Sequence, residues 1–148
     1  FKTLEHRIEP LGQAGGVHFI NDSKSTTVES TRAAILASGT PLILLAGGRD
    51  NKGAPFSEIE GFIREKVHKV ILYGEAREKI AAAWKDLPAV KIEKDFREAV
   101  HLAYEEARPG DTVLLSPMCT SFDQFSSYEH RGETFKKIFH ELEARWNR

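Results

Sequence analysis

The sequence predicts an α/β fold, in which a mostly parallel, doubly wound sheet of five to six strands carries helices on both faces. Short apolar runs of strand length alternate along the chain with longer segments of helical period, the pattern of strand-helix-strand crossover units. Two of the runs, Leu42–Leu45 and Val113–Leu115, are continuously apolar, as strands covered on both faces are. With 148 residues, 41% of them hydrophobic, the chain can bury one core, so we expect a single domain.

Five strand-helix pairs are expected along the chain. They are strand 17–22 with helix 28–37, strand 42–46 with helix 58–67, strand 70–73 with helix 75–87, strand 90–92 with helix 96–107, and strand 112–116 with helix 133–146. Gly39 and Pro41 end the first helix, and Ser57 is expected to cap the second. The two continuously apolar strands belong in the middle of the sheet, whereas Val90–Ile92 alternates with a charge and belongs nearer an edge.

Charge and cysteine content exclude several classes of function. The chain carries 21 Lys and Arg against 22 Asp and Glu, so it has no basic field to hold nucleic acid or an anionic membrane. Cys119 is the only cysteine and no Cys/His cluster has zinc spacing, which favours a reducing compartment. The apolar runs are too short to cross a bilayer, and the first residues do not form a targeting segment. We therefore expect a cytoplasmic monomer that binds small molecules or protein surfaces.

Three long polar loops follow the three most apolar strands. They span Asn21–Thr27, Gly47–Pro55 and Ser116–Gly132. Because the carboxyl ends of parallel strands lie on one rim of a doubly wound sheet, the loops are expected to converge on one crevice. The first loop places a carboxylate, an ammonium group and four hydroxyls between a strand and a helix, which indicates a binding site. A solvated turn is the simpler explanation for any one loop alone.

The second loop has glycines whose backbone N–H groups could approach an anion, and Lys52 to supply charge. It is not a P-loop, because Ala54 and Pro55 stand where that motif requires Lys and Ser or Thr. The loop is explained about equally well as a surface turn, in which Lys52 has no function, and as a binding loop.

The third loop contains two candidate nucleophiles, Cys119 and Ser121. Either would need a nearby base, and His130 is the only histidine close in sequence. A structural thiol and ligand-binding hydroxyls are therefore the favoured interpretation.

Four motifs together resemble one known family. They are Leu4-Glu5-His6-Arg7-Ile8-Glu9, then Gly16-Val17 through Asn21-Asp22-Ser23-Lys24-Ser25-Thr26-Thr27, then Gly47-Gly48 with Lys52-Gly53, and finally Leu115-Ser116-Pro117 through Ser121-Phe122-Asp123-Gln124-Phe125 to Tyr128-Glu129-His130-Arg131-Gly132. In order and spacing they resemble the Rossmann-like C-terminal domain of the Mur ligases, most closely that of the UDP-N-acetylmuramoyl-L-alanine:D-glutamate ligases (MurD). Ser25, Thr27, Met118 and Tyr128 depart from the residues that are commoner in that family.

The resemblance implies that residues 1–148 form the amino-acid-binding domain of a three-domain enzyme. An N-terminal UDP-binding domain and a central ATPase domain would lie outside this chain, so the chain alone is expected to be inactive. The complete enzyme would use ATP and Mg²⁺, bound mainly by the central domain. It would add D-glutamate to UDP-N-acetylmuramoyl-L-alanine in peptidoglycan precursor synthesis, through an acyl phosphate.

The resemblance also implies which residues form the site. Those that match the D-glutamate site are Thr26, Lys52, Ser121, Phe122 and Tyr128, with Lys24 beside it. Those that match the residues with which this domain contacts ATP in the family are His6, Arg7 and Asp22. No metal ligand is implied, and Lys24 is the one candidate for a catalytic role. The residue types suit this ligand. D-Glutamate carries two carboxylates, and burying them away from water requires ammonium groups and several hydrogen-bond donors.

Two other interpretations remain at this point. One is a related ligase that adds a different amino acid in the same pathway, or glutamate to folate, although the Asn21–Thr27 segment matches the D-glutamate enzymes better. The other is a free-standing module that binds an acidic small molecule or a partner protein. A P-loop encoded upstream would separate the ligases from the module.

Overall fold

A six-stranded sheet forms the centre of the structure, a computed structural model that describes residues 4–146. Its strands are β1 (Glu9–Ala14), β2 (Val17–Asn21), β3 (Leu42–Gly47), β4 (Lys69–Tyr73), β5 (Val90–Ile92) and β6 (Thr112–Met118). They lie in the order β1-β2-β6-β3-β4-β5, with β1 antiparallel to β2 and every other pair parallel. The predicted fold class is confirmed, as are the central places of β3 and β6 and the edge place of β5.

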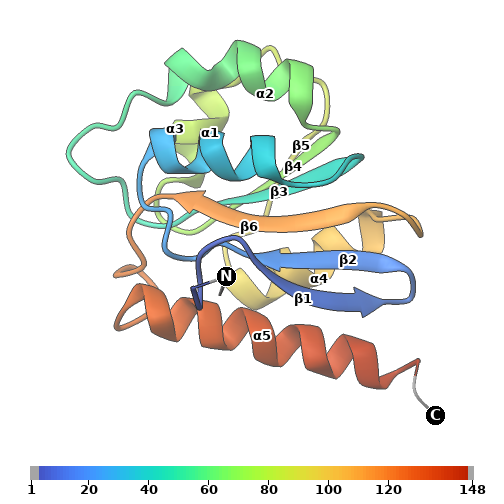
Figure 1. The fold of residues 1–148 in the computed structure, drawn as a ribbon. Coiled ribbons are helices and arrows are strands. Elements are labelled where there is room, and N and C mark those ends of the chain that lie inside the picture. The colour runs from blue at the N-terminus through green and yellow to red at the C-terminus, as the bar shows by residue number, and fades with distance from the viewer. Residues whose placement is uncertain (1–3, 147–148) are drawn as a thin grey trace.

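Helices cover both faces of this sheet, and Figure 1 shows α1, α2 and α3 on one side and α4 and α5 on the other. The helical elements are α1 (Val28–Ala37), the 3₁₀ helix η1 (Phe56–Ile59), α2 (Glu60–Lys66), α3 (Arg77–Ala83), α4 (Phe96–Glu106) and α5 (Tyr128–Ala144). Each central strand sends alternate side chains to two separate cores. Leu44 and Leu114 pack under α1 to α3, whereas Leu45 and Leu115 pack against α4 and α5.

The structure differs from the expected elements at several places, and the expected helix 75–87 is shorter than predicted, since α3 spans Arg77–Ala83. Strand β1 was not predicted, and its irregular pairing with β2 between Pro10 and Gly12 explains why no alternation marks it. Helix α5 begins at Tyr128 rather than Glu133, because the Ser127 hydroxyl caps it by accepting from the His130 amide. Ser57 is not a cap, since it lies inside η1.

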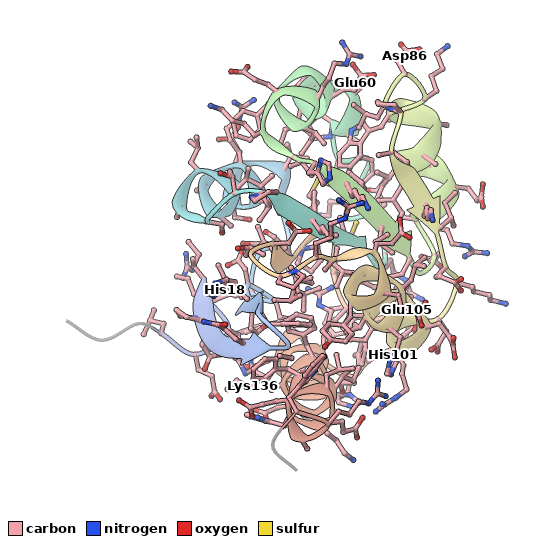
Figure 2. All side chains as sticks on the ribbon, turned by 90° about the vertical axis from the view of Figure 1, so that its right-hand side faces the viewer. His18, Glu60, Asp86, His101, Glu105 and Lys136 are labelled. Carbon is pink, nitrogen blue, oxygen red and sulfur yellow. The ribbon has the colours of Figure 1, made fainter. Side chains whose placement is uncertain are left out.

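The N-terminal segment and β1 are joined to α5 by charge. Lys136 lies on α5 close to β1 (Figure 2), and its ammonium group is 2.6 Å from a Glu5 carboxylate oxygen and 3.0 Å from one of Glu9. These contacts help to hold residues 5–9 beside the rim of the sheet. Among residues 4–146 there is no helix long and apolar enough to cross a membrane.

Candidate functional site

The three polar loops lie at the carboxyl ends of β2, β6 and β3, which are neighbours in the sheet, so their predicted convergence is confirmed. Backbone hydrogen bonds tie the loops to one another. The Met118 amide donates to the Ser25 carbonyl at 3.1 Å, and Arg49 and Thr120 exchange two bonds of 3.0 Å. These backbone bonds join the three loops into one continuous rim, and such support is what holds a binding site in a fixed geometry.

Asp22 is buried at the start of the first loop and accepts three hydrogen bonds. Its Oδ2 accepts from the hydroxyls of Ser25 at 2.5 Å and Ser116 at 2.6 Å, and its Oδ1 accepts from the Ile8 amide at 3.1 Å. Burial raises the pKa of this carboxyl above its ordinary value, against the opposing effect of these hydrogen bonds and of the Arg7 charge. Asp22 thus fixes the backbone next to Arg7, which is exposed at the rim.

His6 anchors the same segment from its other side. The residue is 3% exposed, its Nδ1 lies 2.9 Å from the side-chain nitrogen of Asn21, and its carbonyl accepts from the Lys24 backbone amide at 3.0 Å. The ring rests on Gly132 of α5, where an added Cβ would lie 2.1 Å from His6 Nδ1. A side chain at position 132 would therefore displace His6.

We expect Gly132→Ala to destabilise the domain by about 1–3 kcal/mol through overpacking, although alanine is favoured over glycine by about 1 kcal/mol inside helices. Gly61→Ala is the matched control, because Gly61 also lies in a helix and a Cβ there would meet no atom within 4 Å. Denaturant unfolding of the 148-residue chain measures both. Stabilisation by both substitutions would contradict the packing of His6 on Gly132.

Lys52 lies on a turn whose conformation is stabilised by contacts of neighbouring residues. Its side chain is exposed and its φ is 61°. Asp50 organises the turn by accepting from the Ala54 amide at 2.9 Å and by pairing with the Lys79 ammonium group. Burial disfavours the Asp50 charge, but the Lys79 contact and the amide bonds outweigh it and lower the pKa of that carboxyl.

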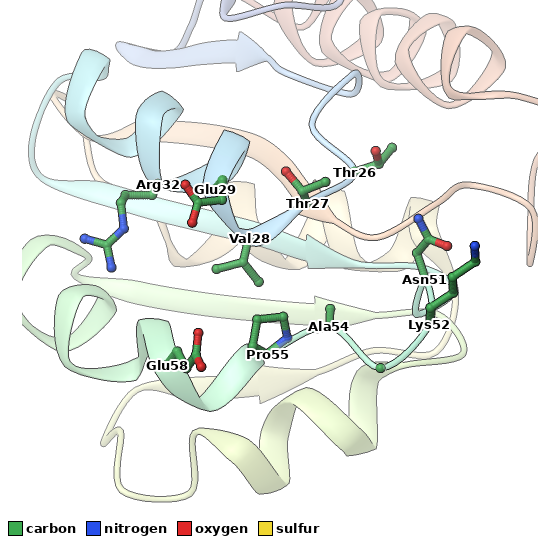
Figure 3. A pocket seen from close by; sticks show the side chains of 11 residues that line it. Thr26, Thr27, Val28, Glu29, Arg32, Asn51, Lys52, Ala54, Pro55 and Glu58 are labelled. Atoms are coloured by element: carbon green, nitrogen blue, oxygen red, sulfur yellow. The ribbon is translucent and has the colours of Figure 1, made fainter.

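A groove of about 290 Å³ runs between the start of α1 and this turn. Figure 3 shows Thr26, Asn51 and Lys52 at one end of it and Arg32 and Glu58 at the other. Within residues 4–146, no carboxylate lies within ion-pair distance of the Lys52 or Lys24 ammonium group. The groove brings together two of the predicted D-glutamate residues, Thr26 and Lys52.

The other four predicted D-glutamate residues lie outside the lining of this groove. Lys24 and Tyr128 come together, with the ammonium nitrogen 5.9 Å from the ring centroid. Ser121 is buried in the loop after β6, and the neighbouring Phe122 is 58% exposed. The structure thus places the predicted residues on one rim in separate groups, and their joint role in binding stays a prediction.

Nucleophilic catalysis gains no support from the third loop. Cys119 is fully buried, and burial raises the pKa of its thiol to about 12, so it carries no thiolate at neutral pH. The His130 ring is engaged elsewhere, where its Nδ1 accepts from the Ser126 amide at 3.1 Å.

Backbone strain concentrates at the rim. Four non-glycine residues of the described chain have positive φ, namely His6, Ile8, Lys52 and Met118. Each such conformation costs on the order of 1–3 kcal/mol, most clearly for a β-branched residue such as Ile8. These residues flank Arg7 or lie in the second and third loops, which agrees with a functional rim.

Glu5, His6 and Glu133 lie close enough to hold a metal ion, but one of the two His6 ring nitrogens is already bonded to Asn21. The Asn21 side-chain oxygen accepts from the Ser23 amide, so its NH₂ group faces His6 and donates to Nδ1. The other ring nitrogen, Nε2, lies 3.6 Å from a Glu133 carboxylate oxygen and 3.8 Å from one of Glu5. The ring is thus held by Asn21 on one side and faces two exposed carboxylates on the other.

Arg131 is the residue at the site whose role was not predicted. It lies within α5, is 0% exposed, and donates to Ser23 and to the Cys119 carbonyl. Its position in the buried stripe formed with Phe135, Ile138 and Leu142 is a signal that the sequence contains, because an arginine in an apolar stripe at helical spacing is exceptional.

Comparison with known proteins identifies close relatives of the whole chain. The UDP-N-acetylmuramoylalanine–D-glutamate ligase of Chlamydia pneumoniae is 44% identical over 144 residues, which cover 97% of this chain and 34% of the relative. The enzyme of the same name from Chlorobaculum tepidum is 45% identical over 142 residues, covering 96% and 30%. The chain therefore spans about a third of the length of these relatives.

Solved structures and a family match agree with this relation. A folylpolyglutamate synthase of Mycobacterium tuberculosis, solved with ADP and AMPPCP, superposes with a TM-score of 0.63 at 12% identity, covering 92% of this chain and 32% of that one. The MurF ligase of Thermotoga maritima in complex with ADP gives 0.57 at 16% identity, covering 98% and 33%. These two likenesses show the fold alone. Residues 6–119 match the family described as "Mur ligase, glutamate ligase domain", and the chain therefore belongs to the Mur ligase family.

Proposed function

We propose that this chain is the C-terminal domain of an ATP-dependent ligase that adds D-glutamate to UDP-N-acetylmuramoyl-L-alanine during peptidoglycan precursor synthesis. The relatives that carry the D-glutamate ligase name match almost the whole chain at 44–46% identity. The UDP-binding and ATPase domains would occupy the remaining two thirds of such a protein. This chain alone would be inactive, because Mg²⁺ and most of the nucleotide contacts would belong to the central domain.

The observation that carries the proposal is the display of Lys52 beside Thr26 in the groove, with no carboxylate partner in the described chain. A ligand with two carboxylates needs charged donors that are not already neutralised. Lys52 and Lys24 would supply charge, and Thr26 and Ser121 would supply hydroxyl donors. Phe122 and Tyr128 would shield the bound amino acid from water, which strengthens these interactions.

Arg7, His6 and Asp22 would act on the side of the nucleotide. Arg7 is exposed and suits phosphate oxygens, whereas the Asp22 oxygens are already occupied by three protein donors. We therefore assign Asp22 and His6 the task of holding Arg7 in place rather than that of touching the nucleotide. ATP would supply the activation of the substrate carboxylate, and this domain would supply the positioned amine and positive charge.

The first experiment is a chemical-shift titration of the 148-residue chain with D-glutamate, with L-glutamate as the control. We expect shifts of the amides around Thr26, Lys52 and Ser121 with the D isomer alone. Phosphate release by the full-length protein, with UDP-N-acetylmuramoyl-L-alanine and each amino acid in turn, then tests the reaction. Release that depends on a different amino acid, or on folate, would contradict the proposal.

A further inference from the structure

Arg131 is the point at which all three rim loops meet. Its Nε donates to Ser23 Oγ at 2.9 Å and its Nη2 to the Ser23 carbonyl at 2.7 Å, so the guanidinium grips the first loop twice. Its Nη1 donates to the Cys119 carbonyl at 3.0 Å in the third loop. Gly48 brings the second loop so close that an added Cβ would lie 3.3 Å from Nη1.

Core packing alone does not account for an arginine at this position. The guanidinium is fully buried, and no carboxylate between residues 4 and 146 lies within ion-pair distance of it. Burying a charge without an opposite charge is costly, and an apolar side chain would fill the stripe more cheaply. What arginine supplies instead is a planar fork that can hold several acceptors in fixed directions.

The bonds of Arg131 reach residues next to those predicted to bind D-glutamate. Ser23 precedes Lys24, and Cys119 lies two residues before Ser121. The Ser23 hydroxyl, which accepts from Arg131, donates in turn to the Tyr128 carbonyl at 2.7 Å. Arg131 and Ser23 thereby fix the distance between Lys24 on the first loop and Tyr128 at the start of α5.

Other contacts hold the part of the rim around Arg7 and Asp22, which is the part predicted to face the nucleotide. Asp22 is fixed by Ser25, Ser116 and the Ile8 amide, none of which touches Arg131. Loss of the Arg131 contacts should therefore disturb the amino-acid side of the site more than the nucleotide side.

We propose that Arg131 is a positioning residue that aligns the three loops for D-glutamate binding and leaves ATP binding to the Asp22 contacts. The proposal rests on the proposed function, and it adds a residue that touches neither substrate.

The test uses Arg131→Lys and Ser23→Ala in the full-length ligase, alone and combined. Lysine keeps the charge but loses the fork, and Ser23→Ala removes one acceptor without introducing bulk. We expect each to raise KM for D-glutamate about ten-fold while KM for ATP changes by less than about two-fold. Because the two side chains act through one contact, the double variant should be no worse than the poorer single one.

Arg97→Lys is the matched control, since Arg97 is paired at the surface with Glu141 at 2.7 Å, and its kinetics should stay unchanged. Thermal unfolding of every variant separates positioning from folding. If KM for D-glutamate stays at the wild-type value while the unfolding temperature falls, or if both KM values rise together, Arg131 is only structural and the inference is wrong. A wild-type enzyme that does not depend on D-glutamate would instead refute the proposed function.

Discussion

Asp22→Asn should make the domain more stable at neutral pH and the full-length ligase about a hundred-fold less active in kcat/KM. Burial raises the pKa of Asp22, so its charge opposes folding once the carboxyl ionises. The oxygen of the introduced side-chain amide can still accept from the Ile8 backbone amide, while its NH₂ group donates to the Ser25 and Ser116 hydroxyls. The Ser116 hydroxyl then donates to Thr31 Oγ1 at 2.9 Å. Activity falls because the neutral group no longer attracts the Arg7 charge.

The raised pKa of Asp22 also determines how the stability difference between Asp22→Asn and the wild-type chain changes with pH. Since the folded pKa lies above the unfolded value of about 3.9, the wild-type chain binds more protons when folded between the two pKa values, and its stability falls as pH rises through that window. The advantage of Asp22→Asn should therefore grow from pH 4 upward, as followed by urea unfolding at several pH values. Asp86→Asn, at an exposed carboxylate, is the control and should show no such trend. A stability difference independent of pH would refute the assignment.

The central part of the fold could be predicted because local and tertiary preferences agree there. The apolar runs of β3 and β6 are buried on both faces, so composition alone places them in the middle of the sheet. Strand β1 contains Pro10 and Gly12, which disfavour regular strands, and it exists because β2 and α5 offer it partners. Its formation is a tertiary effect that no local pattern marks.

The start of α5 was missed for a related reason. Gly132 is a poor helix former and the expected helix began just after it, yet its missing side chain is what allows His6 to pack there. Placing the helix start at Glu133 removed Arg131 from the amphipathic stripe and concealed its burial. One tertiary contact thus accounts for both the wrong boundary and the missed residue.

The candidate site could be located from the sequence but not assembled from it. Parallel topology sends three loops to one rim, so their convergence follows from the strand order. The contacts that shape the rim, such as Ser116 to Asp22 or Arg131 to Ser23, join residues about a hundred positions apart. Sequence spacing carries no information about such pairs, whereas the resemblance to a family supplied candidate residues without their geometry.

Lys52→Ala should reduce kcat/KM for D-glutamate by about 10- to 100-fold in the full-length ligase and leave KM for ATP nearly unchanged. A hydrogen bond from an ammonium group to a buried carboxylate contributes about 1.5–3 kcal/mol, and no other described residue neutralises Lys52. The fold should tolerate the change, because the side chain is exposed. Alanine at a φ of 61° is as strained as lysine, so the turn held by Asp50 keeps the same backbone cost.

Lys85→Ala is the matched control for this loss of charge, since Lys85 is also exposed and has no ion pair within the described chain. It follows α3, at the end opposite the rim, because a crossover helix runs antiparallel to the strands it joins. Steady-state kinetics with each substrate varied in turn should show an effect of Lys52→Ala alone, concentrated in KM for D-glutamate. Equal losses for D-glutamate and ATP would mean that Lys52 acts on the shared closed geometry of the domains rather than on the amino acid, and its assignment to the D-glutamate site would be abandoned.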